Sequence, residues 1–179
     1  MKGKYLIAPC AAWIDEKLKP NVYAVVTLKQ AIRAPNFEQS RWIRGTRSIF
    51  EDEVARFYCR LAKEIHGRSA WSRHKHKLII PNAATIEGGA IGTIDGDWHS
   101  SGFRSSAIYS VTQKRAHINI LLRQPEKISF PAFSQRFTDV WRSMDWAMPD
   151  VYIEKRTGNC VGYSLKEGMD SLLVESMKF

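Results

Sequence analysis

The chain has 179 residues, of which 44% are hydrophobic, so it is long enough for one domain with a sizeable core. Its 27 Lys and Arg outnumber its 18 Asp and Glu, giving a formal net charge of +9. This charge favours a polyanionic partner, usually nucleic acid, although a basic surface with no binding role is the alternative.

Several protein classes are excluded. The 3 cysteines form no Cys-x-x-Cys pair, which argues against a disulfide framework and a structural zinc site. No apolar run approaches the length of a membrane span. The apolar residues after Met1 are interrupted by Pro9 and Asp15, so we expect no signal peptide and a cytoplasmic location.

The first half of the chain predicts one strand and one long helix. The β-branched run 21–29 follows a proline and is typical of a central strand. The residues 41–47 form a basic connection. Ser48 to Glu51 have the pattern of a capping box, with Ser48 as N-cap and Glu51 reaching back to it. Apolar residues then recur at helical spacing as far as Gly67, which predicts a helix.

The second half alternates between predicted strands and helices. We expect, in chain order, a basic loop at 68–77, a strand at 78–87, a long hairpin or disordered excursion at 88–106, a short strand at 107–111, a strand at 117–122, a helix at 130–144, a strand at 151–154 and a helix from Gly162 onward. This order predicts a single α+β domain over 1–179. Its architecture would be an antiparallel central sheet with helices packed on one face, in a ferredoxin-like split β-α-β arrangement.

Tyr163 and Lys166 form a Tyr-x-x-Lys motif. Residues three apart on a helix share one face. A phenol is a weak nucleophile at neutral pH, and a neighbouring ammonium can favour the phenolate or stabilise the charge of a phosphate that it attacks. By itself a tyrosine three residues before a lysine is common in proteins, so the motif alone does not indicate a function.

A second motif is the strand segment His117-Ile118-Asn119. Alternation along a strand places His117 and Asn119 on one face. An imidazole and an amide oxygen are both competent ligands of a divalent cation, and Glu87, at the end of the neighbouring predicted strand, could add a carboxylate. This set suits Mg²⁺ or Mn²⁺ better than a closed zinc site. A polar strand face turned to solvent is the alternative.

The order of these motifs resembles that of the rolling-circle replication initiators. These are endonucleases of plasmids and phages with a histidine-hydrophobic-histidine strand and a Tyr-x-x-Lys helix. The segment 25–29 is similar to their first motif, and the similarity runs from about Val22 to Gly168. Asn119 stands where the family has its second histidine, so an amide ligand replaces an imidazole. The gap from Glu87 to His117 is also longer than the family pattern.

The resemblance implies a mechanism. Tyr163 would attack a phosphodiester of single-stranded or hairpin origin DNA, leaving a 5′-phosphotyrosyl link and a free 3′-hydroxyl, and would later rejoin the ends. Glu87, His117 and Asn119 would hold the metal, and Lys166 would steady the nucleophile or the phosphate. A bacterial host, with its helicase and polymerase as partners, is implied. A relaxase or transposase of the same superfamily, or a non-catalytic nucleic-acid-binding module, is the alternative.

Basic and aromatic side chains outside these motifs are expected to contact DNA. The predicted contacts are Lys29, Arg41, Trp42, Arg44, Arg47, Arg68, Trp71, Arg73, His74, Lys75 and Lys77. The His74-Lys75-His76 pattern lies among cations, which disfavours a metal. Asp95-Gly96-Asp97 is more typical of a turn than of a metal site. Tyr109 and Tyr152 lack a lysine three residues on and are expected to pack in the core or sheet.

Overall fold

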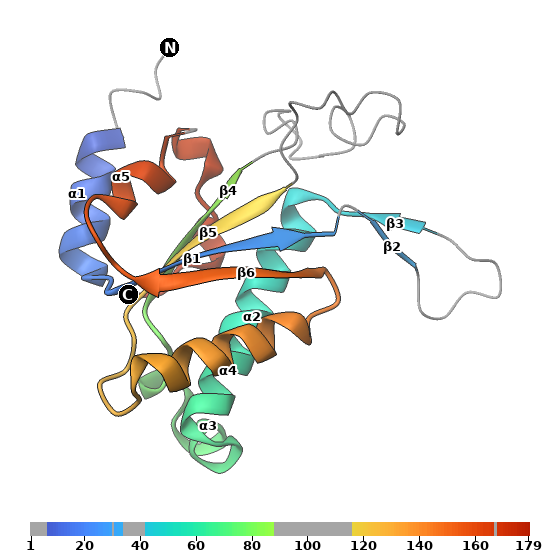
Figure 1. Cartoon of the computed structure of the whole chain (residues 1–179), viewed down its shortest axis with the longest axis vertical. Helices are drawn as coiled ribbons and strands as arrows, with labels where there is room; N and C mark the ends of the chain where they lie inside the picture. The colour runs from blue at the N-terminus through green and yellow to red at the C-terminus, as the bar shows by residue number, and fades with distance from the viewer. Residues whose placement is uncertain (1–6, 30, 34–41, 88–115, 167) are drawn as a thin grey trace.

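The computed structural model describes residues 7–29, 31–33, 42–87, 116–166 and 168–179 (Figure 1). In chain order the elements are α1 (Ile7–Leu18), β1 (Val22–Leu28), β2 (Ala31–Arg33), β3 (Trp42–Arg44), α2 (Arg47–His66), α3 (Arg68–His74), the 3₁₀ turn η2 (Lys75–Lys77), β4 (Asn82–Glu87), β5 (His117–Leu122), α4 (Phe130–Arg142), β6 (Ala147–Lys155), α5 (Cys160–Ser164) and the 3₁₀ turns η5 (Met169–Ser171) and η6 (Val174–Ser176). No helix within these ranges is long and apolar enough to cross a membrane.

The four-stranded sheet has the order β4-β5-β1-β6, and every neighbouring pair is antiparallel. β1 and β4 run in the same direction with β5 between them, and α2 lies in the connection that joins them. β5 and β6 are related in the same way across β1, with α4 in their connection. The α+β class and the split β-α-β arrangement predicted from the sequence are thereby confirmed. β2 and β3 form a separate two-stranded ribbon (Figure 1).

The main core lies between the sheet and the two long helices α2 and α4. Alternate residues of β1 face it, and the apolar stripes of both helices pack against them. Its largest fully buried side chains include Phe57, Phe133, Phe137 and Trp141. Phe57 contacts the rings of Phe137 and Trp141 edge-on at centroid distances of 4.8 and 5.4 Å, so aromatic contacts join α2 to α4.

The opposite face of the sheet is partly covered by α1, α5 and the C-terminal segment. Ile14 and Leu18 of α1 and Val161 and Leu165 near α5 form a second buried cluster there. The sequence pattern did not predict α1. Pro9 interrupts its apolar run but lies in the first turn of the helix, where proline is tolerated because that N–H has no partner inside the helix.

The start of α2 differs from the predicted capping box. Thr46, not Ser48, is the N-cap, and its hydroxyl accepts the N–H of Ile49 at 3.2 Å. The Glu51 carboxylate accepts the N–H of Glu175 at 2.7 Å instead of returning to the cap. The predicted end is confirmed, because Gly67 closes the helix with φ of 85°, a conformation that glycine adopts without strain.

Other predicted boundaries also shift. The expected loop at 68–77 is the helix α3 followed by η2, and the basic connection at 41–47 contains β3. The strand predicted from residue 78 begins only after Pro81, which has no N–H to give to a ladder. The final helix ends at Ser164 and is followed by short 3₁₀ turns. The predicted elements at 88–106 and 107–111, with Asp95-Gly96-Asp97 and Tyr109, lie outside the described residues.

The cap of α2 can be tested with two neighbouring hydroxyls. Thr46→Ala removes the acceptor for the Ile49 N–H and should lower the stability by about 1 kcal/mol, which in a domain of this size lowers Tm by about 2–4 °C. Ser48→Ala, the matched control, should leave Tm unchanged in the same thermal unfolding experiment. The reverse result would restore Ser48 as the cap.

Candidate functional site

Glu87, His117 and Asn119 come together at one end of the sheet. In the antiparallel β4–β5 ladder Glu87 lies opposite His117, and Thr85 lies opposite Asn119. Alternation sends Ile86 and Ile118 into the main core. The four polar side chains therefore stand on the other face, the one partly covered by α5, as the sequence predicted for His117 and Asn119.

The Glu87 carboxylate is the centre of this cluster. It is only 2% exposed, yet it has three partners. The Asn119 amide donates to Oε1 at 2.5 Å, while His117 Nε2 and Lys166 Nζ lie 3.2 and 2.8 Å from Oε2. A buried carboxylate is tolerated only when donors and countercharges surround it, and this arrangement supplies both.

Tyr23 fixes the orientation of the Asn119 amide. Its hydroxyl donates to Asn119 Oδ1 at 2.7 Å, across from β1. A carboxylate can only accept, so the amide nitrogen must face Glu87 and the amide oxygen must face Tyr23. Burial, followed by the charges of Tyr163 and Glu87, raises the pKa of Tyr23. The hydroxyl therefore keeps the proton that it donates.

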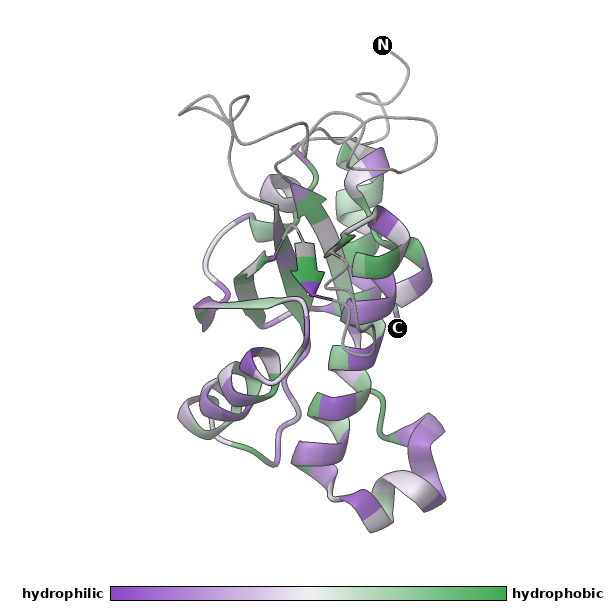
Figure 2. Cartoon of the chain, turned by 90° about the vertical axis from the view of Figure 1, so that its right-hand side faces the viewer, coloured by the Kyte–Doolittle hydropathy of each residue, from purple (hydrophilic) through white to green (hydrophobic). Residues whose placement is uncertain are grey.

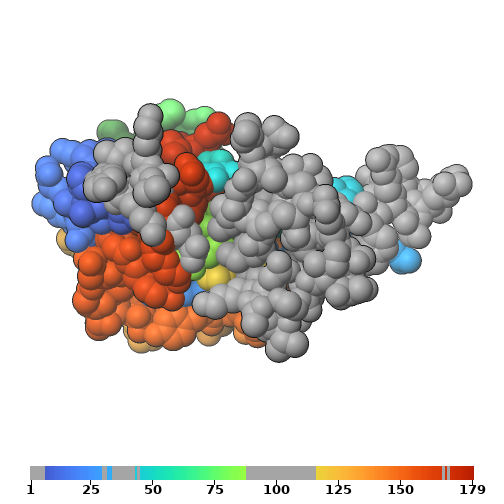
Figure 3. All heavy atoms as spheres, turned by 90° about the horizontal axis from the view of Figure 1, so that it is seen from above, coloured from blue at the N-terminus to red at the C-terminus, as the bar shows by residue number. Residues whose placement is uncertain are grey.

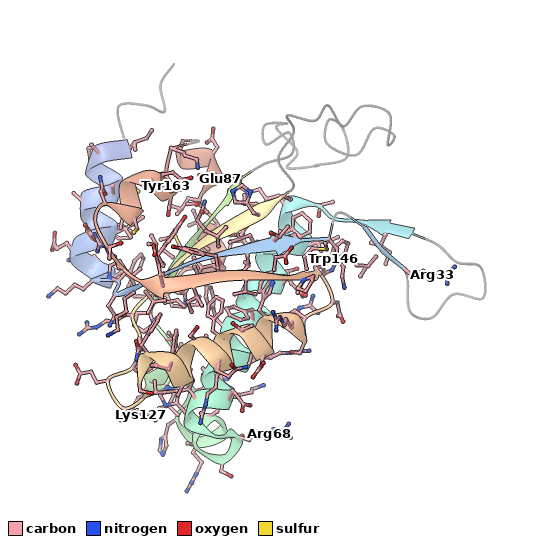
Figure 4. All side chains as sticks on the ribbon, viewed as in Figure 1. Arg33, Arg68, Glu87, Lys127, Trp146 and Tyr163 are labelled. Carbon is pink, nitrogen blue, oxygen red and sulfur yellow. The ribbon has the colours of Figure 1, made fainter. Side chains whose placement is uncertain are left out.

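Lys166 contacts both Tyr163 and this cluster, and Figure 4 shows Tyr163 on the same side of the molecule as Glu87. The Asn159 side chain caps α5 by accepting the N–H of Gly162 at 3.0 Å. The helix ends at Ser164, but the Lys166 N–H donates to the Tyr163 carbonyl at 3.1 Å, so a turn keeps the two side chains adjacent. Tyr163 is 53% exposed. The ammonium of Lys166 lies 3.7 Å from the centre of the Tyr163 ring, a cation–π contact.

Lys166 thus connects the phenol to the buried carboxylate. Partial burial lowers the pKa of Lys166, but hydrogen bonds to Glu87 and Tyr163 outweigh this effect and raise it overall. The side chain is therefore a fixed positive charge at neutral pH. A charge in this position can favour the negative charge of a phosphate that approaches Tyr163.

The spacing of two of the three predicted metal ligands suits a divalent cation, but Glu87 Oε2 pairs with Lys166 Nζ at 2.8 Å, and this contact would have to open for a metal to bind. Adjacent ligands of an octahedral ion with bonds of about 2.1 Å lie about 3 Å apart, close to the 3.2 Å between Glu87 Oε2 and His117 Nε2. Asn119 directs its amide nitrogen, which cannot ligate a metal, at Glu87, and fits only if the amide turns over. No cluster of three His, Cys, Asp or Glu suited to a metal occurs among the described residues.

Of the predicted DNA contacts whose side chains the structure describes, two hold backbone near the sheet and the others lie elsewhere. Lys29 donates to the Asp145 carbonyl at 3.0 Å, and Arg47 donates to the carbonyls of Asp170 and Leu172, the latter at 2.7 Å. Both cations therefore hold backbone in this structure. Arg41 and the side chains of Trp42 and Arg44 lie outside the described residues.

The basic segment 68–77 lies at the other end of the molecule. Figure 4 shows Arg68 far from Glu87 and Tyr163, and Figure 2 shows mainly hydrophilic residues at this end. Arg68 and Trp71 border a cleft of about 570 Å³ between α2, α3 and α4. Arg60 and Lys63 of α2 also line it. No sequence signal distinguishes these two residues, because they lie on the polar face of a helix, where charged side chains are ordinary.

Seen from above, atoms of α1, in blue, and of the C-terminal part of the chain, in red, lie on the same side of the molecule (Figure 3). The site lies where Lys166, which follows α5, meets Glu87 at the end of β4 and close to His117 at the start of β5. Comparison with models of known protein families, with curated proteins and with solved structures found no match. The geometry of the site is therefore the basis for assigning a function.

The role of the Asn119 amide can be tested by replacing its NH₂ group with oxygen. Asn119→Asp removes the donor to Glu87 and places two buried carboxyl groups together. We expect a loss of about 2–3 kcal/mol, seen as a fall in Tm of about 4–12 °C. The matched control is Asn159→Asp, because this exposed side chain acts only as an acceptor, and its Tm should stay close to wild type. An unchanged Tm for Asn119→Asp would contradict the hydrogen bond to Glu87.

Proposed function

We propose that the protein is a metal-dependent endonuclease and strand transferase that nicks single-stranded DNA through Tyr163, as a rolling-circle replication initiator does. The observation that carries the proposal is the contact of Lys166 with both the exposed Tyr163 ring and the buried Glu87 carboxylate. It joins a nucleophile of the right type to a cluster of the right ligand types. The +9 charge supports a nucleic-acid substrate.

In the proposed reaction the phenol oxygen of Tyr163 forms a bond to phosphorus. The bond from phosphorus to the 3′ oxygen breaks, and the leaving oxygen takes up a proton, while the phenol proton passes to solvent. The product is a 5′-phosphotyrosyl link and a free 3′-hydroxyl that can prime synthesis. Because Tyr163 is half exposed, a strand can reach it without displacing the core.

Lys166 supplies positive charge beside the new bond. Its ammonium lies against the Tyr163 ring and is held there by Glu87. It therefore needs little reorganisation when negative charge develops on the phosphate, which is the condition for effective electrostatic stabilisation. His117 and Glu87 would hold Mg²⁺ or Mn²⁺, which would polarise the scissile phosphate as a Lewis acid. Asn119 would join them as a ligand if its amide turned over.

The proposed substrate is single-stranded or hairpin origin DNA of a plasmid or phage in a bacterial cytoplasm. Attack by a tyrosine beside a sheet requires a phosphate that can bend into the site, which paired and stacked bases resist. The cleft beside Arg68 and Trp71, at the far end, offers a second place for the backbone of the same DNA.

A non-catalytic nucleic-acid-binding module is the second function in view. Its support is the orientation of Asn119, which leaves only two ready metal ligands, and the ammonium of Lys166, which already pairs with Glu87. The two functions differ in one observable, the covalent link between protein and DNA.

The nucleophile can be tested by Tyr163→Phe. Loss of the hydroxyl removes the attacking atom but keeps the ring, so covalent adduct and nicked product should disappear while DNA binding stays nearly unchanged. The assay is incubation with single-stranded DNA and Mn²⁺, followed by a denaturing gel. Tyr152→Phe, another exposed tyrosine, should retain full adduct formation. Cleavage by Tyr163→Phe would give the role to another residue, and absence of adduct with the wild-type protein would favour the non-catalytic module.

The metal can be tested by chelation and by His117→Ala. Excess chelator should stop adduct formation, and Mg²⁺ or Mn²⁺ should restore it. His117→Ala should lower the rate by at least about 100-fold, because loss of even an outer partner of a metal ligand costs about 10–100-fold. A rate that is indifferent to chelator would show that Lys166 alone supplies the positive charge.

A further inference from the structure

Tyr152 lies in the same transverse row of the sheet as part of the site. In β6 it faces Val25 of β1, the other neighbour of Val25 is Asn119 of β5, and Asn119 in turn faces Thr85 of β4. Residues that lie opposite one another in a ladder point to the same face. The Tyr152 side chain therefore stands on the face that carries Glu87 and His117.

The sheet face is exposed to solvent at Tyr152, whereas the next row of residues on the same face is buried. In the next row Ala83, Leu121 and Tyr23 are buried in the cluster beneath α1 and α5. Tyr152 is 53% exposed, although the sequence analysis expected it to pack in the core or sheet. Its strand is at the edge of the sheet, and Val25 beside it is partly exposed. The helices that cover the site thus end before they reach Tyr152.

The ring of Tyr152 is held in place before any ligand arrives. Its hydroxyl donates to Glu154 Oε2 at 2.5 Å, two residues along the same strand face. This hydrogen bond raises the pKa of Tyr152, so the group stays a neutral phenol. A ring that is already fixed loses little side-chain entropy on binding.

We propose that Tyr152 is a stacking platform for an unpaired base of the strand whose phosphate is held at Tyr163. Exposed aromatic side chains on four-stranded sheets bind bases of single strands in this way, and stacking tolerates any base. The identity of the strand rests on the proposed function, whereas the contact between ring and base does not.

Tyr152 lies two strands away from Asn119 in this row. Two strand separations of about 4.8 Å place Tyr152 about 10 Å from Asn119 across the sheet. Stacked nucleotides rise about 3.4 Å each, so this distance corresponds to about three nucleotides, and to fewer in an extended strand. A base held there would limit sliding of the strand past Tyr163.

The experiment compares two 12-nucleotide ligands with the same number of phosphates, one of thymidines and one of abasic sites. All proteins carry Tyr163→Phe so that binding stays reversible, and Kd is measured by fluorescence anisotropy. We expect the parent to prefer the thymidine strand. Tyr152→Leu, which keeps apolar bulk without the ring, should weaken thymidine binding by about 5- to 150-fold and leave abasic binding unchanged.

Two controls accompany this variant. Tyr152→Phe keeps the ring and should keep the preference. Trp13→Leu removes another exposed aromatic ring, which lies on α1 and packs edge-on against Phe179, and should change neither Kd. Equal Kd of Tyr152→Leu and the parent for the thymidine strand would overturn the platform, as would an equal loss on the abasic strand.

The outcome is independent of catalysis. If a protein that retains Tyr163 forms no adduct but base preference still depends on Tyr152, the platform is supported and the nuclease proposal falls. If adduct forms and Tyr152→Leu binds thymidine normally, the nuclease proposal stands and the platform falls.

Discussion

A carboxylate that is 2% exposed must be surrounded by donors, and the site depends on how Glu87 meets this requirement. Its three partners come from two separate parts of the chain, since His117 and Asn119 belong to β5 and Lys166 follows α5. The register of β4 against β5 and the docking of α5 must therefore both be correct for the charge to be satisfied. The interaction that stabilises the buried carboxylate also brings Lys166 against Tyr163.

The docking of α1 and α5 divides one face of the sheet into a covered part and an open part. The covered part packs like a core and fixes Tyr23, which in turn orients the Asn119 amide. The open part leaves Tyr152 accessible in the same transverse row. A site at such a boundary combines rigid side chains on strands with access for a long ligand, and rigid support is what keeps reacting groups in position.

The elements that the sequence predicted well are those with a strong pattern of their own. β1 is a β-branched apolar run after a proline, β5 has strong apolar character, and α2 and α4 repeat their apolar side chains about every 3.6 residues; all four form as expected. Short or docked elements were missed. α1 contains a proline, and α3 consists mostly of polar residues. Thr46 is the N-cap of α2, although Ser48, two residues later, fits the capping-box pattern better. In these places tertiary contacts select among local alternatives of similar energy.

The sequence by itself determined the residue types of the site, the common face of His117 and Asn119, and the closeness of Tyr163 to Lys166, because each follows from the period of a single strand or turn. Only the tertiary structure decided that Glu87 joins both motifs, that Tyr23 turns the Asn119 amide toward Glu87, that Tyr152 shares their row, and that the segment 68–77 lies elsewhere. These relations join residues far apart in the chain. They depend on strand register and helix docking, which minimise the free energy of the whole fold and leave no signature in any short segment.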